Sequence, residues 1–247
     1  MNTSQYIPYD SVAAIMLKRP EYPEFPFLSG TGFFVYFPPY EDIFFITARH
    51  CVIDNEGNIK GDIKIPYDPN DRRKEAEAIC FSSYLEGAYF DAKDEREDIV
   101  VYVADDISDD KKKILMKRAL RLQHQDEVNK IINFIIASQG KIRTVGFPSI
   151  SKSIDYEKSQ ALFQPRGFHA IIKGKEQLKN WYRFTKSSWK EGGLNGFSGS
   201  PILELCRLSP SEIVPVPIGV LLTTSQFLSI NVATDLIATY LNETNKS

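Results

Sequence analysis

Short runs of apolar residues, separated by polar, proline or glycine turns, recur along most of the chain. The densest in the first half are Thr31–Phe37 (TGFFVYF), Ile43–Ala48 (IFFITA) and Ile99–Ala104 (IVVYVA). β-Branched and aromatic residues dominate each run, which is typical of β-strands. Repeated prolines before residue 29 predict an irregular opening arm, because proline interrupts long regular elements.

The middle of the chain changes from strand to helix periodicity. Ser108 is a residue type that often caps the N-terminus of a helix, and Asp109 and Asp110 follow it. Apolar residues then recur at helical spacing as far as Gly140. This stretch predicts one long helix or two short ones. Short strands resume after Gly140, and residues 233–243 (ATDLIATYLNE) have the pattern of a closing amphipathic helix.

Two groups of short strands, with helices between and after them, predict a mainly β protein. Two small antiparallel β-barrels packed together are the architecture that fits this order. A chain of 247 residues suits one such domain. We expect a single domain over residues 1–247, divided into an N-terminal arm (1–28), a first barrel (29–107), a helical inter-barrel insertion (108–140), a second barrel (141–231) and a C-terminal helix and tail (232–247).

Composition and charge exclude several functional classes. Lysine and arginine total 30 against 32 aspartates and glutamates, so the net charge of −2 offers no basic surplus for a nucleic acid. The N-terminus has neither a basic segment nor an unbroken apolar run, so we expect no signal peptide, and no apolar run is long enough to span a membrane.

Cysteine and histidine positions bear on compartment and on metal binding. Cys51, Cys80 and Cys206 are an odd number without metal-like spacing, which disfavours a disulfide framework and favours a reducing cytoplasm. His124 and His169 have no cysteine or acid at ligand spacing, so we predict no zinc site. No cofactor is expected.

Three short segments carry the side chains of a hydrolytic site. Ser198 stands between glycines in GFSGSP, where backbone N–H groups can converge on one small space. His50 follows an apolar strand in TARHC, and Asp98 directly precedes the strand IVVYVA. Alone, each is more often a turn, packing or surface residue.

The conjunction of the three is more informative than any one of them. A serine hydroxyl is a weak nucleophile until a base takes its proton, and the base needs a carboxylate to fix its tautomer. Here the three residues occur in the order His, Asp, Ser, which belongs to one of the three familiar triad architectures. Cys51 is a second candidate nucleophile, but adjacent strand residues point to opposite faces.

Five blocks of the sequence together resemble the trypsin-like (chymotrypsin-fold) serine peptidases. They are TGFFV (31–35), ITARHCV (46–52), DIVVYV (98–103), GFSGSPIL (196–203) and IGVLLTT (218–224). The resemblance implies that Ser198 attacks a carbonyl, that His50 shuttles the proton and that Asp98 holds His50. It also implies an oxyanion hole from the backbone N–H groups of Gly196 and Ser198. Main-chain groups that it assigns to an extended substrate belong to Leu222, Thr223 and Thr224.

Two departures from the family point to its intracellular, bacterial members. Phe197 stands where secreted relatives have an aspartate that captures a new N-terminus, so activation by N-terminal processing is not expected here. No cysteine lies in Thr31–Phe37 to pair with Cys51. The oxyanion loop is therefore expected to be preformed, or ordered by a partner or by substrate.

The sequence thus predicts a cytoplasmic serine endopeptidase that acts on polypeptides, with an activating or sensing protein as a possible partner. Intracellular relatives include effectors of bacterial defence systems, which is an inference from resemblance. The alternative is a catalytically silent module that acts as a binding scaffold. Specificity is expected from Ser187–Gly193 and Leu222–Ser225. If Asp98 is not the orienting acid, Asp94 and Asp91 are the next candidates.

Overall fold

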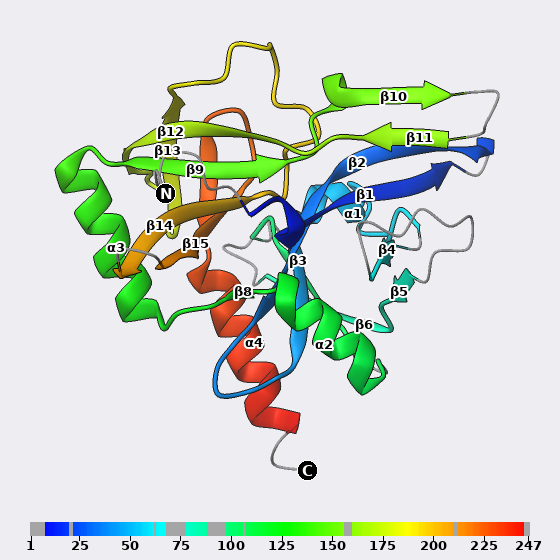
Figure 1. Cartoon of the computed structure of the whole chain (residues 1–247), viewed down its shortest axis with the longest axis horizontal. Helices are drawn as coiled ribbons and strands as arrows, with labels where there is room; N and C mark the ends of the chain where they lie inside the picture. The colour runs from blue at the N-terminus through cyan, green and yellow to red at the C-terminus, as the bar shows by residue number, and fades with distance from the viewer. Residues whose placement is uncertain are drawn as a thin grey trace.

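The computed structural model describes two β-structures joined by helices (Figure 1). The residues it describes, called the described chain below, are 8–19, 22–61, 63–67, 78–87, 97–105, 107–155, 160–209 and 212–244.

The first half forms a six-stranded sheet. Its order is β1-β2-β3-β7-β6, with β8 pairing in parallel with β2. Every residue of β3 is buried, and facing aromatic rings fill the interior, such as Phe34 and Phe45 with centroids 5.0 Å apart. The bounds are β1 (Val12–Arg19), β2 (Tyr22–Tyr36), β3 (Ile43–Thr47), β6 (Ser83–Glu86), β7 (Val100–Val103) and β8 (Leu120–Arg121).

The second half is a closed six-stranded barrel, in the order β12-β13-β16-β15-β14-β9. Side chains alternate along β12, so Phe168, Ala170 and Ile172 are buried while their neighbours are not. Closure leaves no unpaired sheet edge at this point of the molecule. The bounds are β9 (Lys141–Gly146), β12 (Arg166–Lys175), β13 (Trp181–Lys186), β14 (Pro201–Ser209), β15 (Glu212–Leu221) and β16 (Gln226–Ser229).

Two helices and a short strand connect the halves. α2 (Asp109–Arg118) follows the N-cap Ser108, β8 comes next, and α3 (Gln125–Ser138) ends at Gln139, which has a left-handed backbone. The buried Arg118 guanidinium donates to three backbone carbonyls, those of Asp10, Pro66 and Tyr67, at 2.6–3.0 Å. The helical insertion is thereby attached to two segments of the first half of the chain.

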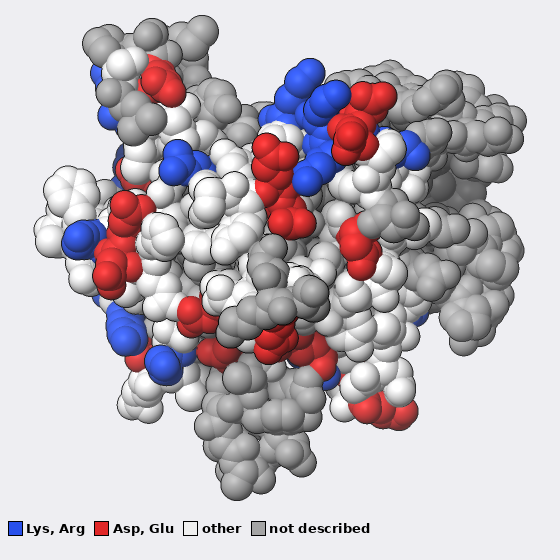
Figure 2. All heavy atoms as spheres, turned by 90° about the horizontal axis from the view of Figure 1, so that it is seen from below, with Lys and Arg blue, Asp and Glu red and all other residues white. Residues whose placement is uncertain are grey.

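The C-terminal helix α4 (Asn231–Thr244) runs beside the first sheet (Figure 1). The face seen from the lower side of Figure 1 carries acidic and basic side chains interspersed with uncharged surface (Figure 2). No helix of the described chain is both long enough and apolar enough to cross a membrane. The smaller elements are η2 (Tyr9–Ser11), α1 (Arg49–Val52), β4 (Lys64–Pro66), β5 (Ala78–Cys80), η3 (Ser149–Ser151), β10 (Lys152–Asp155) and β11 (Gln160–Phe163).

The fold-class prediction is confirmed: the protein is mainly β, with helices between the two β-structures and at the C-terminus. The expectation of an irregular opening arm is wrong, because β1 and β2 form a long hairpin whose residues Ile15 and Leu17 are fully buried. Pro23 and Pro26 lie in the part of β2 that pairs only with β1. The other side of the strand is unpaired there, so a proline, which has no N–H to donate, is tolerated. The segment boundaries remain a prediction.

Candidate active site

His50 lies on the single helical turn α1, which follows β3 after one extended residue, Ala48. Cys51 and Val52 are completely buried and anchor the turn, while the His50 side chain keeps 48% of its surface exposed. Lys60 Nζ donates to the His50 carbonyl at 2.6 Å. His50 and Cys51 lie on a helical turn and not on a strand, so the prediction that strand alternation directs them to opposite faces is wrong. Burial of the thiol is what disfavours it as a nucleophile.

Asp98 holds His50 at two points. Its Oδ1 accepts from the His50 backbone N–H at 2.9 Å, and its Oδ2 lies 2.6 Å from His50 Nδ1. Since a carboxylate only accepts, the Nδ1 proton is fixed on the Asp98 side and Nε2 is left for another group. The predicted pair is thus brought together. Asp91 and Asp94 lie outside the described residues.

The pKa of His50 reflects opposing influences. Burial by itself lowers the pKa, but the hydrogen bond to Asp98, the neighbouring Cys51 and the Asp98 charge together raise it to about 10. These interactions favour the protonated imidazole, which acts as a base only after it loses a proton.

Ser198 lies on a tight turn between two short hydrogen-bonded loops. The Phe197 N–H donates to the Leu194 carbonyl at 2.9 Å, and the Gly199 N–H donates to the Leu221 carbonyl at 2.7 Å. Gly199 has φ +85°, and a Cβ there would lie 2.0 Å from the Thr31 oxygen, so only glycine fits.

The Ser198 hydroxyl does not donate to His50 in this structure. It donates to the Leu222 carbonyl at 3.1 Å, and no hydrogen bond joins it to His50 within the described chain. The two segments nevertheless lie together, because the Cys51 thiol is 3.5 Å from the Ser198 carbonyl oxygen. The site thus has an assembled His50–Asp98 pair and a Ser198 hydroxyl that is directed at the Leu222 carbonyl.

Two backbone N–H groups of the turn are available to an anion. Neither the N–H of Gly196 nor that of Ser198 donates a hydrogen bond within the described chain. The Asn195 carbonyl accepts from Ser149 N at 2.8 Å. Since N–H and C=O point in opposite directions across a trans peptide, the Gly196 N–H is directed away from Ser149.

The Phe197 side chain is completely buried under the turn. Its ring packs edge-on against Phe168 and Trp189, with both centroid distances 5.2 Å. Trp189 Nε1 also donates to the Gly192 carbonyl at 3.1 Å. A buried apolar ring therefore stands where the secreted relatives are expected to have an acid, and Trp189 packs against it.

Comparisons with known proteins bear on the fold. No family model matches the sequence, and no curated protein does. Among solved structures, human heparin binding protein superposes with a TM-score of 0.58 at 17% identity, covering 96% of this chain and 94% of that one. A double mutant of the same human protein gives a TM-score of 0.58 at 16% identity, covering 98% and 94%.

The chain has a chymotrypsin-like fold. The likeness extends over nearly the whole of both chains, and at these identities it shows the fold alone. The residues of a chymotrypsin-fold site must therefore be judged from their own geometry. Within the described chain, no group of three or more histidine, cysteine or acidic side chains is arranged to hold a metal ion.

The predicted substrate edge lies in the tight connection from β15 to β16. Leu222 and Thr223 both donate their N–H groups to the Gln226 carbonyl, at 3.1 and 3.3 Å. Neither the N–H nor the carbonyl of Thr224 is hydrogen-bonded within the described chain, and Thr224 is exposed. Thr224 and the Leu222 carbonyl are thus the groups best placed to pair with a peptide strand, whereas the Thr223 amide is engaged.

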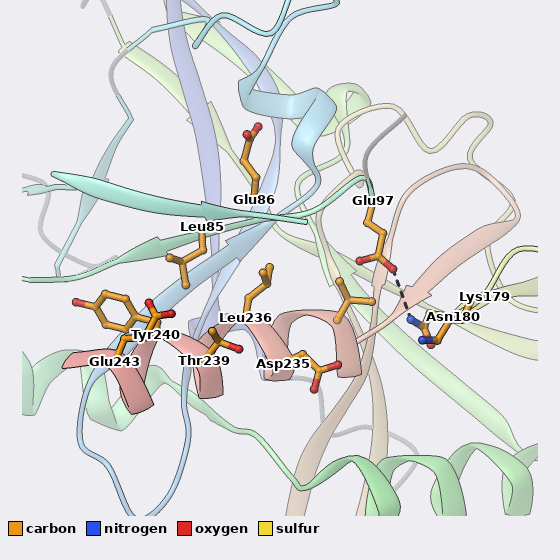
Figure 3. Close-up of a pocket in the computed structure, with 11 residues that line it drawn as sticks. Leu85, Glu86, Glu97, Lys179, Asn180, Asp235, Leu236, Thr239, Tyr240 and Glu243 are labelled. Carbon is orange, nitrogen blue, oxygen red and sulfur yellow. Dashed lines mark hydrogen bonds between the residues drawn. The ribbon is translucent and has the colours of Figure 1, made fainter. Parts of the chain in front are cut away.

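A cleft of about 620 Å³ lies between β6, α4 and the Lys179–Asn180 turn (Figure 3). Glu97, which precedes Asp98, accepts a hydrogen bond from Asn180 Nδ2 at 3.5 Å across one end of the cleft. Ser198 does not line this cleft. The cleft is therefore not the place of the candidate nucleophile.

Sequence reasoning missed one residue of the site, Thr31. It is fully buried in β2, and its backbone N–H donates to the Ser198 carbonyl at 2.8 Å. The only sequence signal is a hydroxyl residue between two glycines at the start of an apolar strand, Gly30 and Gly32.

Proposed function

We propose that the chain is a serine endopeptidase that hydrolyses peptide bonds of protein substrates through Ser198, His50 and Asp98. The observation that carries the proposal is the double hydrogen bond from Asp98 to His50, at 2.9 and 2.6 Å. A carboxylate that fixes both the backbone and the ring of one histidine leaves Nε2 as the only basic position. The two unpaired N–H groups of the adjacent serine turn support the same role.

The reaction begins with an extended peptide at Leu222 and Thr224. A substrate N–H that donates to the Leu222 carbonyl competes with the Ser198 hydroxyl, which is then released from its resting bond. Neutral His50 accepts the hydroxyl proton while Ser198 Oγ bonds to the substrate carbonyl carbon. The oxyanion that forms accepts from the N–H groups of Gly196 and Ser198.

The tetrahedral intermediate collapses when His50 returns its proton to the leaving amine, so the C–N bond breaks and an acyl-enzyme remains. Water then attacks the ester carbon and gives its proton to His50. The acid product leaves, and Ser198 recovers its hydroxyl proton from His50. No cofactor or metal takes part in these steps.

The arrangement of the serine turn supports activity without an obligatory partner. The turn is held by the buried Phe197 ring and by the Ser149–Asn195 hydrogen bond, both internal to the chain. A sensing or activating protein would then act on substrate access or on the Ser198 hydroxyl. A cytoplasmic location and a role as a bacterial defence effector are proposals from the sequence, in which three cysteines stay free.

The alternative function is a catalytically silent module that binds protein. The bond from the Ser198 hydroxyl to the Leu222 carbonyl favours it, because a serine held there does not attack. The two functions differ in whether substrate releases that bond.

Incubation of the purified chain with a mixture of unfolded proteins separates the two functions. New N-termini, identified by mass spectrometry, should appear with the wild type and be absent with Ser198→Ala. Ser200→Ala is the matched control, since the Ser200 hydroxyl is buried and has no hydrogen-bond partner in the described chain. Cleavage that is equal in wild type and Ser198→Ala, or absent from both, would overturn the peptidase proposal.

A further inference from the structure

Thr31 connects the first sheet to the serine turn through both its backbone and its side chain. Its N–H donates to the Ser198 carbonyl at 2.8 Å, and its own carbonyl accepts from the Thr47 hydroxyl at 2.8 Å. Its hydroxyl donates to the Gly196 carbonyl at 2.7 Å and accepts from the Phe147 N–H at 2.9 Å. The side chain is thus used fully, as one donor and one acceptor.

The two peptide planes on either side of Gly196 are fixed by different residues. Ser149 N holds the Asn195 carbonyl, and the Thr31 hydroxyl holds the Gly196 carbonyl. Gly196 itself has φ +91°, a conformation that glycine enters and leaves readily. The Gly196 N–H belongs to the plane that Ser149 holds, whereas the Gly196 carbonyl shares its plane with the Phe197 N–H, which donates to the Leu194 carbonyl at 2.9 Å. Rotation about Gly196 would therefore change the angle between the Gly196 N–H and the Ser198 N–H. The hydroxyl therefore selects one of the conformations that this glycine permits.

The surroundings of the turn make this anchor specific. A Cβ on Gly196 would lie 2.3 Å from the Phe147 carbonyl, and a Cβ on Gly146 would lie 3.0 Å from the Thr31 hydroxyl. The loop from Gly146 to Ser149 is thus pressed against the turn, and Thr31 fills the space between them.

We propose that Thr31 is a positioning residue, whose hydroxyl holds the Gly196 carbonyl and so keeps the N–H groups of Gly196 and Ser198 directed at one point, where they bind the oxyanion. This rests on the proposed peptidase function and adds to it a residue from the other half of the molecule. Thr31 is fully buried, so we expect it to make no contact with substrate. It acts through Gly196, and its contribution is realised in the transition state, when negative charge develops on the substrate oxygen.

The test compares two substitutions that differ in one group. Thr31→Val keeps the shape of the side chain and removes the hydroxyl, which leaves the Gly196 carbonyl and the Phe147 N–H without partners. Thr31→Ser keeps the hydroxyl and removes the methyl. Thr144→Val is the matched control, because Thr144 is equally buried but its hydroxyl has no hydrogen-bond partner in the described chain.

Steady-state kinetics on a peptide substrate should separate positioning from general stability. For Thr31→Val we expect kcat to fall by about 10²-fold, the scale of losing one oxyanion donor, while KM changes less than about twofold because ground-state binding is untouched. The rate of fluorophosphonate labelling should fall in parallel, since the phosphonyl oxygen occupies the same position. Thr31→Ser should recover kcat to within about threefold of the wild type, and Thr144→Val should match the wild type.

Several results would overturn the inference. They are wild-type kcat in Thr31→Val, a loss in Thr31→Ser as large as that in Thr31→Val, or an equal loss in Thr144→Val. If Thr31→Val does not fold by circular dichroism, Thr31→Ala replaces it and the same comparison with Thr31→Ser applies. A folded wild type that neither labels nor cleaves overturns the peptidase proposal and this inference together. An active wild type with an equally active Thr31→Val overturns only this inference.

Discussion

Asp98→Asn replaces one carboxylate oxygen of the candidate triad with an amide NH₂ and leaves its size unchanged. The carboxylate makes two hydrogen bonds, one to the His50 backbone N–H and one to His50 Nδ1. Asparagine has a single oxygen, so it can accept only one of them. If the oxygen stays on the backbone N–H, the NH₂ group faces Nδ1.

This exchange changes the tautomer of the histidine. A ring nitrogen that faces an amide NH₂ must accept, so the proton moves to Nε2, where it cannot take a proton from Ser198. The loss that a wrong tautomer causes in enzymes of this type is about 10⁴-fold in kcat, equivalent to about 5.5 kcal/mol of activation free energy. The geometry of the site otherwise remains intact, so KM should change little.

The assay is turnover of a peptide substrate by wild type and Asp98→Asn, together with an NMR titration of the His50 ring. The pKa of His50 should fall when the Asp98 hydrogen bond and charge are lost, because burial is then opposed only by the neighbouring Cys51. A loss of less than about tenfold in kcat would refute Asp98 as the orienting acid. An unchanged His50 pKa would refute the proposed source of its elevation.

Four further predictions concern pH, packing and backbone conformation. Because His50 acts as a base only when neutral and its pKa is raised from 6.5 to about 10, kcat/KM should rise with pH with a midpoint above 6.5; a fully active enzyme at pH 6 would contradict this. The same shift means that protonated His50 stabilises the fold below pH 6.5 and that this contribution disappears as the pH rises through about 10, which urea unfolding at several pH values can measure. Phe197→Ala should lower the free energy of unfolding by about 3–5 kcal/mol and slow labelling; wild-type stability would show that the ring is no anchor. Gly199→Ala should cost at least about 2 kcal/mol in strain, read from Tm, and unchanged labelling would contradict the tight turn.

The strands with the densest apolar runs were predictable from the sequence. Ile43–Ala48 and Ile99–Ala104 are buried on both faces, and local composition is enough to identify such strands. The β1–β2 hairpin was not predictable, because the tolerance of Pro23 and Pro26 depends on which side of the strand is left unpaired. That depends on the sheet as a whole.

The candidate site was likewise predictable only in part from the sequence. The residues His50, Asp98 and Ser198 were predictable from their types and order, and the structure brings His50 and Asp98 into contact. The direction of the Ser198 hydroxyl depends on a carbonyl 24 positions away, that of Leu222. The role of Thr31 depends on contacts that span up to 165 positions, for which local sequence carries no signal.

Reaction with a fluorophosphonate probe, followed by peptide mapping of the adduct, tests the central claim most directly. A nucleophilic Ser198 that is activated by His50 should carry the adduct, and labelling should vanish in Ser198→Ala and in His50→Ala while it persists in Ser200→Ala. Folded wild type that shows no adduct up to pH 10, or an adduct on another residue that survives Ser198→Ala, would contradict the account.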